Sequence, residues 1–424
     1  MRTLLSAVAA MLVFAPAAAT APHDRPKSDS VRFATFNLSL NRGAAGQLAD
    51  HLAHPEVDDQ SRRQARNNAE VIQRVRPEVL LINEFDFDPA AVGLFQSNFL
   101  SQSQNGSTPI GYPYSFIAPS NTGIPTGMDL FNDGSVGGPN DAYGFGFFPG
   151  QFGMVVYSKY PILDERVRTF QLFRWKDMPG ALLPDDPRTA APADWYSPAE
   201  LEIFRLSSKS HWDIPILIHG KVIHFLVSHP TPPVFDDPGP FTPHIPAGVD
   251  FNGRRNYDEI RFWADYISPG SQSRYIYDDS GRYGGLKPGE RFVIAGDQNS
   301  DPLDGDSVEG AIQQLLEHPL VNAKVTPESA GGPEAAALQG GANESHEGDP
   351  RFDTADFNDS APGNLRADYV LPRKNLQIRD SAVFWPVQAN PFFRLTGVFD
   401  LANWGQVGGF PTSDHRLVWV DVKS

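Results

Sequence analysis

The residues of this sequence that could do chemistry stand where short apolar runs begin or end. Six runs carry a carboxylate, a carboxamide or an imidazole at one end: ATFNLS with Asn37, LLINEFD with Glu84, FLVSHPTPP with His229, IAGDQNSDP with Asp297 and Asn299, LRADYVLP with Asp368, and TSDHRL with Asp414 and His415. A rigid strand holds a polar group at its end accurately, as a preorganised site requires. We therefore expect these runs to be strands that deliver the functional groups.

The side-chain types agree on one kind of chemistry. Asn, Glu and Asp offer hard oxygen ligands, which suit Mg²⁺, Mn²⁺ or Ca²⁺. His229 and His415 could donate to phosphate oxygens or transfer protons near neutral pH, and a carboxylate such as Asp368 would fix the tautomer of His415 and raise its pKa. These are the parts of metal-assisted phosphoester hydrolysis. Each residue taken singly is about as well explained as a cap or a loop hydrogen bond, so the prediction depends on their joint presence.

The elements that position these residues are mostly strands. Two segments predict helices, one over 61–77 that stops at Pro77 and one over 253–267. His219 and Gly220 predict a hairpin turn. This balance favours two sheets covered by helices. The apolar segments that predict strands are 31–38, 78–85, 153–158, 214–218, 221–228, 291–297, 367–372 and 416–422.

The first residues predict export. Arg2 precedes an apolar run from Leu4 to Phe14 that is too short to span a bilayer, and small residues follow up to Ala21. We interpret residues 1–21 as a signal peptide of a secreted or periplasmic protein, and no later segment predicts a transmembrane helix. The sequence has no cysteine, which excludes zinc held by thiolates.

The charge bears on the partner. The formal charge is −16, and removal of Arg2 with the leader gives 34 − 51 = −17. This argues against a broad basic face for nucleic acid, although a metal in a cleft could still supply local positive charge. Four long segments, 121–144, 179–195, 230–246 and 327–364, are either insertions that bind calcium or shape the substrate site, or solvated disordered loops. The acids of DPLDGDSVEG, 301–310, lack the full calcium-loop spacing, so this segment predicts a turn that could hold a second ion.

The motifs TFN, NE, SHP, GDQN, ADYVL and SDHRLV, in this order over residues 32–422, resemble the endonuclease/exonuclease/phosphatase (DNase I-like) superfamily. The resemblance implies one domain over 30–424 with an α/β fold, a four-layer α/β/β/α sandwich of two mostly antiparallel sheets flanked by helices. It also implies a metal site with Glu84 as the main ligand, Asn37 beside it and Asp414 completing the shell. Mg²⁺ is the expected ion, with Mn²⁺ or Ca²⁺ as alternatives.

The same resemblance implies the catalytic roles. Asp297 would activate or position the attacking water, and Asn299 would orient the water or the phosphate. His415, held by Asp368, would stabilise the transition state, and His229 could protonate the leaving group.

Weaker signals concern substrate binding. Arg254 and Arg255 at the start of a predicted helix could cradle a phosphate, or they could pair with nearby acids on the surface. Tyr157 could face the cleft or pack in the core.

The sequence therefore predicts a secreted, divalent-metal-dependent phosphoester hydrolase. A phosphodiesterase is favoured, with nucleic acid as the first substrate hypothesis. The alternatives are a lipid or inositol phosphoesterase and, less favoured, a non-catalytic binding module on the same scaffold. No obligate protein partner is evident.

Overall fold

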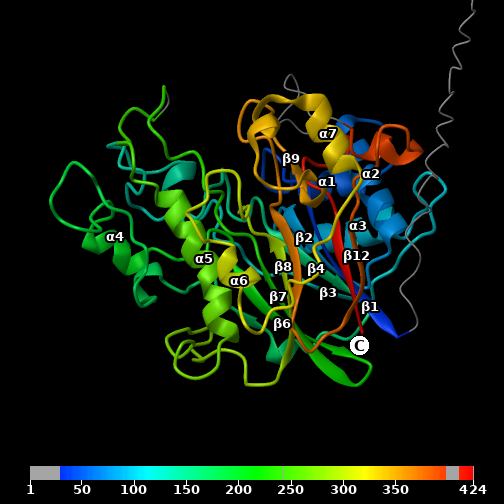
Figure 1. The fold of residues 1–424 in the computed structure, drawn as a ribbon, viewed down its shortest axis with the longest axis horizontal. Helices are drawn as coiled ribbons and strands as arrows, with labels where there is room; N and C mark the ends of the chain where they lie inside the picture. The colour runs from blue at the N-terminus through cyan, green and yellow to red at the C-terminus, as the bar shows by residue number, and fades with distance from the viewer. Residues whose placement is uncertain (1–28, 241, 398–409, 424) are drawn as a thin grey trace, which may run out of the picture.

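A computed structural model describes residues 29–240, 242–397 and 410–423, and in these ranges the strands form two large sheets that face each other (Figure 1). The first sheet has the order β12-β13-β1-β2-β4-β3, the second has the order β11-β8-β7-β6-β5, and β9 pairs with β10. The strand bounds are β1 Ser30–Leu40, β2 Val79–Phe85, β3 Tyr114–Phe116, β4 Met154–Ser158, β5 Arg168–Thr169, β6 His211–Ile218, β7 Lys221–Ser228, β8 Arg291–Asp297, β9 Ala355–Asp356, β10 Asn364–Leu365, β11 Asp368–Pro372, β12 Ile378–Val383 and β13 Val418–Lys423.

Both predicted helices form, with small shifts at their ends. The first begins after Asp59, whose carboxylate accepts from the backbone N–H of Arg62, and it ends at Arg76 in the left-handed conformation just before Pro77. The hairpin turn between β6 and β7 also forms at His219 and Gly220, both with positive φ. The helix bounds are α1 Gln47–Ala53, α2 Gln60–Val75, α3 Pro89–Phe95, α4 Pro198–Ile203, α5 Phe251–Ile267, α6 Gln313–Leu316 and α7 Gly331–Gln339.

Apolar side chains fill the space between the sheets and both outer faces. Successive strand residues point to opposite faces, so each central strand supplies two layers. Between the sheets, the rings of Phe33 and Phe225 lie with centroids 5.5 Å apart. Ile72 of α2 belongs to the layer outside the first sheet, and Trp263 of α5 belongs to the layer outside the second. The predicted fold, a DNase I-like α/β sandwich of two mostly antiparallel sheets flanked by helices, is confirmed.

Two pairs of neighbouring strands run parallel, β1 with β2 and β7 with β8, while the other neighbours in both sheets run antiparallel. Parallel neighbours end at the same edge of a sheet. The ends of β1 and β8 meet across the sandwich, since the Asn37 side chain donates to Asp297. We call this the polar end of the sandwich.

The long segments are packed rather than loose. Leu130, Trp195 and Ile245, from three of them, are buried in the apolar layer outside the second sheet. The fourth segment contains α7, β9 and β10. The disordered alternative is therefore wrong for the described parts of these segments.

Two predictions reach beyond the described residues. The signal peptide at 1–21 lies outside them, and so does part of the proposed single domain, 30–424, whose extent stays a prediction. Among the helices of the described chain, none combines the length and apolar character needed to cross a bilayer.

Candidate active site

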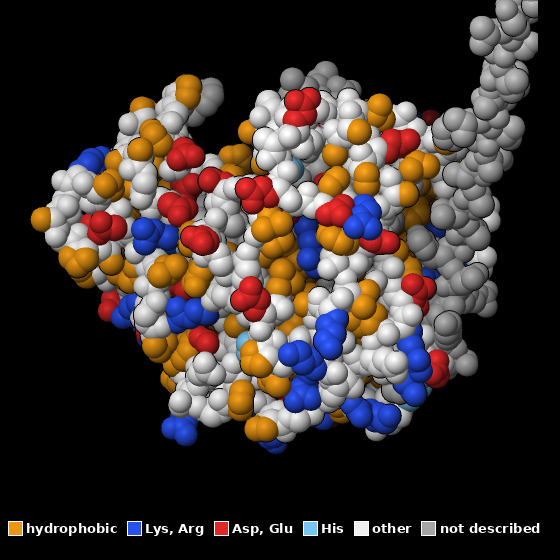
Figure 2. Space-filling model, in the orientation of Figure 1, with side chains coloured by type: hydrophobic (Ala, Val, Ile, Leu, Met, Phe, Trp, Pro, Cys, Tyr) orange, Lys and Arg blue, Asp and Glu red, His pale blue; other side chains and the backbone are white. Residues whose placement is uncertain are grey.

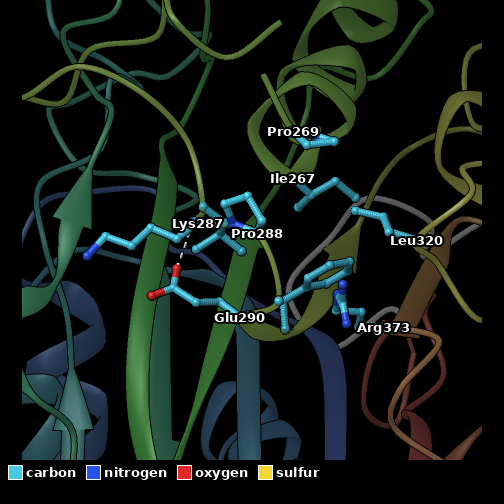
Figure 3. A pocket seen from close by; sticks show the side chains of 10 residues that line it. Ile267, Pro269, Lys287, Pro288, Glu290, Leu320 and Arg373 are labelled. Carbon is cyan, nitrogen blue, oxygen red and sulfur yellow. Dashed lines mark hydrogen bonds between the residues drawn. The ribbon is translucent and has the colours of Figure 1, made fainter. Parts of the chain in front are cut away.

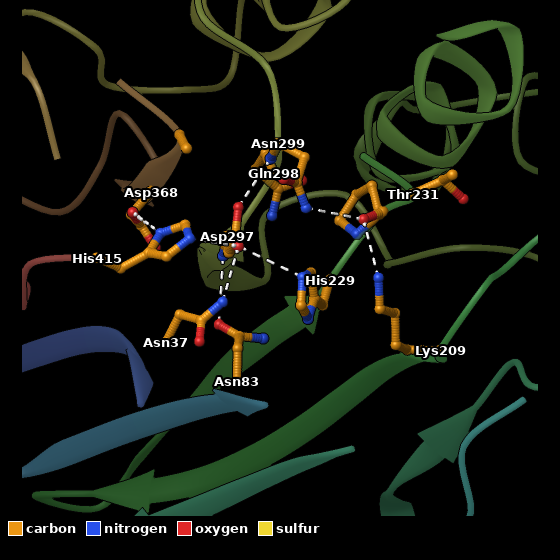
Figure 4. A network of polar contacts seen from close by, with 12 residues as sticks. Asn37, Asn83, Lys209, His229, Thr231, Asp297, Gln298, Asn299, Asp368 and His415 are labelled. Atoms are coloured by element: carbon orange, nitrogen blue, oxygen red, sulfur yellow. Dashed lines mark hydrogen bonds and ion pairs between the residues drawn. The ribbon is translucent and has the colours of Figure 1, made fainter. Parts of the chain in front are cut away.

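The Asp297 carboxylate lies at the centre of the polar end, at the end of β8 (Figure 4). Asn37 Nδ2 donates to Asp297 Oδ2 at 3.1 Å, and His229 Nε2 and His415 Nε2 lie 3.3 and 3.5 Å from the same oxygen. The backbone N–H of Asn299 donates to Oδ1 at 2.9 Å. Asp297 is almost wholly buried. The structure thus brings four sequence-predicted residues to the carboxylate of a fifth, and these five residues come from four distant segments.

His415 is held in one orientation by a second carboxylate. Its Nδ1 bonds Asp368 Oδ2 at 2.8 Å, so Nε2 is left to point toward Asp297. The Thr354 hydroxyl donates to the same Asp368 oxygen at 2.9 Å. All of these groups are buried. The arrangement matches the role expected of Asp368, which is to fix the imidazole.

Burial and charge set the protonation of this pair. Burial alone would raise the pKa of Asp297, but the imidazoles of His415 and His229 hold it well below its usual value. Burial would also lower the pKa of His415, yet the carboxylates of Asp368 and then Asp297 raise it well above its usual value. The centre therefore pairs an ionised carboxylate with a protonated imidazole.

His229 is in the opposite state. Burial and, to a smaller extent, the charge of Lys209 lower the pKa of His229 to about 4, because Asp297 opposes them only in part. The imidazole is neutral at pH 7, and its Nδ1 has no hydrogen-bond partner in the described chain. In this state His229 orients Asp297. Its role as proton donor to the leaving group stays a prediction, and it requires the negative charge of a bound substrate to raise this pKa.

The other two predicted metal ligands, Glu84 and Asp414, lie on the side of Asn37 opposite Asp297. Glu84 ends β2 with φ of 55°, a left-handed conformation that a non-glycine residue adopts at a cost. Burial and the neighbouring Asp414 raise the pKa of Glu84 to about 7, although Asn37 donates a hydrogen bond to it. Asp414 Oδ1 accepts from the Ser39 hydroxyl at 3.0 Å.

This donor set fits a hard divalent cation. Two carboxylates approach each other, and no lysine or arginine of the described chain lies within ion-pair distance of Glu84. Oxygen ligands of this kind suit Mg²⁺, Mn²⁺ or Ca²⁺. Asp297, Asp368 and His415 also lie within 4.8 Å of one another. That trio is less suited to an ion, because His415 is protonated and engaged with Asp368.

Tyr157, one of the three predicted substrate ligands, lies away from the site. Tyr157 is 1 % exposed, its hydroxyl donates to the Val92 carbonyl at 2.7 Å, and its ring packs on Tyr112 in the layer beneath α2 and α3. It therefore belongs to the core, and the prediction that it faces the cleft does not fit. The alternation of side chains along β4 places Tyr157 on the outer face of the sheet, since neighbouring residues of a strand face opposite layers.

Arg255 of α5 does not face a phosphate site, whereas the role of Arg254 stays a prediction. Arg255 is buried and donates to three carbonyls, those of Leu206, Tyr143 and Arg205. Arg254 is half-buried beside Asp250, and its Nε has no hydrogen-bond partner in the described chain. Arg255 thus ties α5 to the preceding loops, because the first turn of the helix faces inward.

Besides Thr354, two further residues of the site were not predicted. Asn83, fully buried, accepts from the Thr35 hydroxyl at 3.2 Å and from the backbone N–H of Asp297 at 3.3 Å. Lys209 is buried just before β6, donates to the Pro230 carbonyl at 3.4 Å, and lies near His229 (Figure 4). Its only signal in the sequence is a lysine directly before an apolar strand, a place where lysines are usually exposed.

A separate pocket lies at the other end of the second sheet, near the start of β8 (Figure 3). Its apolar wall includes Ile267, Phe292 and Leu320, and its charged side chains are Lys287, Glu290 and Arg373. It shares no residue with the polar end. The predicted site residues are therefore not part of it.

Comparison with known proteins identifies the family. The sequence pattern of the Endonuclease/Exonuclease/phosphatase family matches residues 34–415. No curated protein matches the chain. Similar solved structures include an endonuclease/exonuclease/phosphatase from Beutenbergia cavernae, with 16% identity and a TM-score of 0.46, covering 93% of this chain and 72% of that one.

Two further solved structures show a similar extent of overlap. Sphingomyelinase C from Streptomyces griseocarneus is 14% identical with a TM-score of 0.40, covering 92% of this chain and 99% of that one. The human nocturnin catalytic domain is 13% identical with a TM-score of 0.40, covering 94% and 96%. At this distance neither says which substrate this chain takes.

Proposed function

The chain belongs to the Endonuclease/Exonuclease/phosphatase family, and we propose that it is a divalent-metal-dependent phosphodiesterase that works at its polar end. One observation carries the proposal: an ionised Asp297 faces a protonated His415, next to the unneutralised carboxylates of Glu84 and Asp414. A general base, a cationic donor and a set of hard oxygen ligands are the groups that phosphoester hydrolysis requires.

The residues of the chain divide the reaction between them. Asp297 takes the proton of the attacking water, and Asn37 and the Asn299 N–H keep its carboxylate in place. His415, charged and fixed by Asp368, donates to a phosphoryl oxygen and offsets the negative charge that develops there. The phosphorus–oxygen bond to the leaving group breaks as the water oxygen bonds to phosphorus.

A divalent cation fits the oxygen donors of Glu84, Asp414 and Asn37. Bound there, it would attract the phosphate and draw charge from a phosphoryl oxygen. The raised pKa of Glu84 is consistent with this, because a half-buried carboxylate beside another carboxylate is stabilised by a cation.

Hydrolysis of bis(p-nitrophenyl) phosphate tests the proposal, with p-nitrophenyl phosphate as the monoester. Each is measured with Mg²⁺, Mn²⁺ or Ca²⁺ and with EDTA. We expect metal-dependent cleavage of the diester that Asp297→Asn reduces by at least about 100-fold. Asp164→Asn, an exposed acid away from the site, is the matched control. Preference for the monoester, or full activity in Asp297→Asn, would refute the proposal.

An exposed aromatic loop favours a lipid as a second candidate substrate. Phe145 and Phe147 are 49% and 68% exposed, and their rings lie edge to face at 5.6 Å. The loop lies near the polar end, because the Gln151 side chain bonds the backbone N–H of Phe147 and the Arg42 carbonyl, and Arg42 bonds Asp86, two residues after Glu84. Exposed aromatics beside a site suit apolar substrate chains.

The charge of the protein also favours a lipid substrate over nucleic acid. On the face in Figure 2, most acidic side chains lie in the upper half and to the left, and lysines and arginines gather in the lower half. A net charge of −16 opposes binding of a long polyanion such as nucleic acid.

The double variant Phe145→Ala/Phe147→Ala should lose activity on sphingomyelin micelles and keep it on bis(p-nitrophenyl) phosphate. Equal activity of the two proteins on micelles, with cleavage of plasmid DNA, would favour nucleic acid instead.

We also propose that the protein is exported. The support is the leader pattern of residues 1–21. Fractionation of the producing cells and N-terminal sequencing of the mature protein test it, and an intact Met1 in the cytoplasmic fraction would contradict it.

A further inference from the structure

The pocket at the start of β8 is a small cavity with an apolar wall (Figure 3). Its volume is about 140 Å³. Ile267 and Phe292 of this wall are 4% and 1% exposed, and both belong to the apolar layer outside the second sheet. A molecule bound in the pocket would therefore contact side chains of the core.

The volume of the pocket limits its occupant to a small molecule. An apolar cavity of about 150 Å³ in another protein holds one benzene molecule. A ligand whose apolar body has about six to eight carbon atoms is therefore the size that fits. A folded peptide or a long acyl chain is too large to be enclosed there.

Arg373 places a positive charge on the wall, and no acid of the described chain neutralises it. Its guanidinium is half-buried, makes no hydrogen bond within the described residues and has no carboxylate of those residues within ion-pair distance. The backbone fixes its position, since the N–H of Arg373 donates to the Phe292 carbonyl at 2.9 Å and its carbonyl accepts from the N–H of Leu376 at 2.8 Å. A guanidinium has five N–H donors, so this one is available to a ligand.

The other two charged side chains of the pocket are directed elsewhere. Glu290 Oε2 accepts from the backbone N–H of Lys287 at 2.9 Å and lies 3.8 Å from Nε2 of the buried His224. Figure 3 shows the Glu290 carboxylate and the Lys287 ammonium on the side of the pocket away from Arg373. The pocket therefore combines an apolar wall with one cationic group.

We propose that this pocket binds a small organic carboxylate, with its apolar body against Phe292 and Leu320 and its carboxylate on Arg373. Arginine suits this group, because its planar fork can give a carboxylate two parallel N–H···O bonds. The pocket is at the start of β8, whereas Asp297 ends that strand, and the two sites share no residue. Binding there goes beyond the hydrolytic reaction and does not depend on it.

Fluorine NMR with p-fluorobenzoate tests the proposal. The protein is kept in EDTA, so that no metal at the polar end attracts the carboxylate. p-Fluorobenzamide has nearly the same shape without the charge, and fluoroacetate has the charge without the ring. We expect saturable binding of p-fluorobenzoate with a Kd below about 10 mM, and at least about 10-fold weaker binding of the other two, because each lacks half of the interaction.

Two variants assign the binding to the pocket. Arg373→Gln should weaken p-fluorobenzoate binding at least about 10-fold, because the charged partner is lost. Leu320→Trp should abolish it, because the larger side chain fills the cavity. Lys374→Gln is the matched control and should bind as the wild type does, since this exposed neighbour has the same charge and does not line the pocket.

Thermal unfolding shows whether each variant is folded. Arg373→Gln should melt close to the wild type, because its guanidinium makes no contact that the substitution breaks within the described chain, and it decides the test alone should Leu320→Trp fail to fold. The proposal is overturned if p-fluorobenzoate does not bind by about 10 mM. It is also overturned if p-fluorobenzamide binds equally well, or if Arg373→Gln binds as the wild type does.

Discussion

Asp368→Asn tests how His415 acquires its charge. Asparagine can still accept from His415 Nδ1 where the carboxylate accepts at 2.8 Å, so the ring orientation is kept and the negative charge is lost. Burial lowers the pKa of His415, and Asp368 is the largest influence that raises it. In the variant only the smaller influences of Asp297 and Asp414 still raise this pKa, so the pKa of His415 falls.

The magnitude follows from the hydrogen bond that the protonated His415 donates to a phosphoryl oxygen in the proposed mechanism. Such a bond between charged groups is worth about 1.5–3 kcal/mol, and it is lost when the imidazole loses its proton. Lost from the transition state, this corresponds to roughly a 10- to 150-fold decrease in kcat/KM at about 1.4 kcal/mol per tenfold. The wild-type imidazole stays protonated as pH rises past neutrality, whereas the variant loses its proton at lower pH. The ratio of wild-type to variant activity should therefore grow from pH 5 to pH 8.

Two measurements check this prediction. NMR titration of His415 gives its pKa in both proteins, and bis(p-nitrophenyl) phosphate hydrolysis at saturating metal gives kcat/KM against pH. Thr354→Val is the control, because it removes a hydrogen bond to Asp368 and leaves the charge. An unchanged pKa of His415, or an activity loss that does not depend on pH, would refute the reasoning.

Three further variants test other side chains. Glu84→Gln should abolish most metal-dependent activity, and it should raise the Tm of the metal-free protein more at pH 8 than at pH 5. The reason is that burial raises the pKa of Glu84 to about 7, so its ionised form destabilises the folded protein increasingly as pH rises from about 4.5 through that value. A larger gain in Tm at pH 5 would contradict this. Lys209→Met should raise the pKa of His229 from about 4, measured by NMR titration, since it removes a nearby cation, whereas an unchanged pKa would mean that burial alone sets it. Arg255→Ala should destabilise the protein by about 2–4 kcal/mol in urea unfolding, because three carbonyls lose a charged donor, and activity per folded molecule should be kept; a selective loss of activity would restore its predicted role at the phosphate.

The central strands and the edge strand β11 were predictable, and the other three edge strands were not. Each predicted strand corresponds to an observed one with small shifts, because central strands buried on both faces read as continuous apolar runs. The strands that were missed in the two large sheets, β3, β5 and β12, all lie at sheet edges. Edge strands are shorter or less apolar, so the sequence gives them little pattern.

The position of a residue along a strand was likewise predictable, and the face it occupies was not. Asn37 and Asp297 were expected at strand ends and meet there, although 260 residues separate them. Tyr157 was placed by its strand alone, and its side chain points to the outer layer of the core. Arg255 was placed by its helix start, and the helix turns it inward. The face that a side chain occupies depends on which sheet or loop packs against its strand or helix, and the sequence alone does not specify this.

The sequence by itself determined which groups this protein has for chemistry and that strands would carry them. It also determined the family, through motifs in a fixed order over most of the chain. Only the tertiary structure decided the charge of each group. Asp297 is ionised, His415 is protonated and His229 is neutral, because burial and the through-space charges of residues from distant strands set each pKa. A sequence specifies residue types, whereas the free energy of a charge depends on everything folded around it.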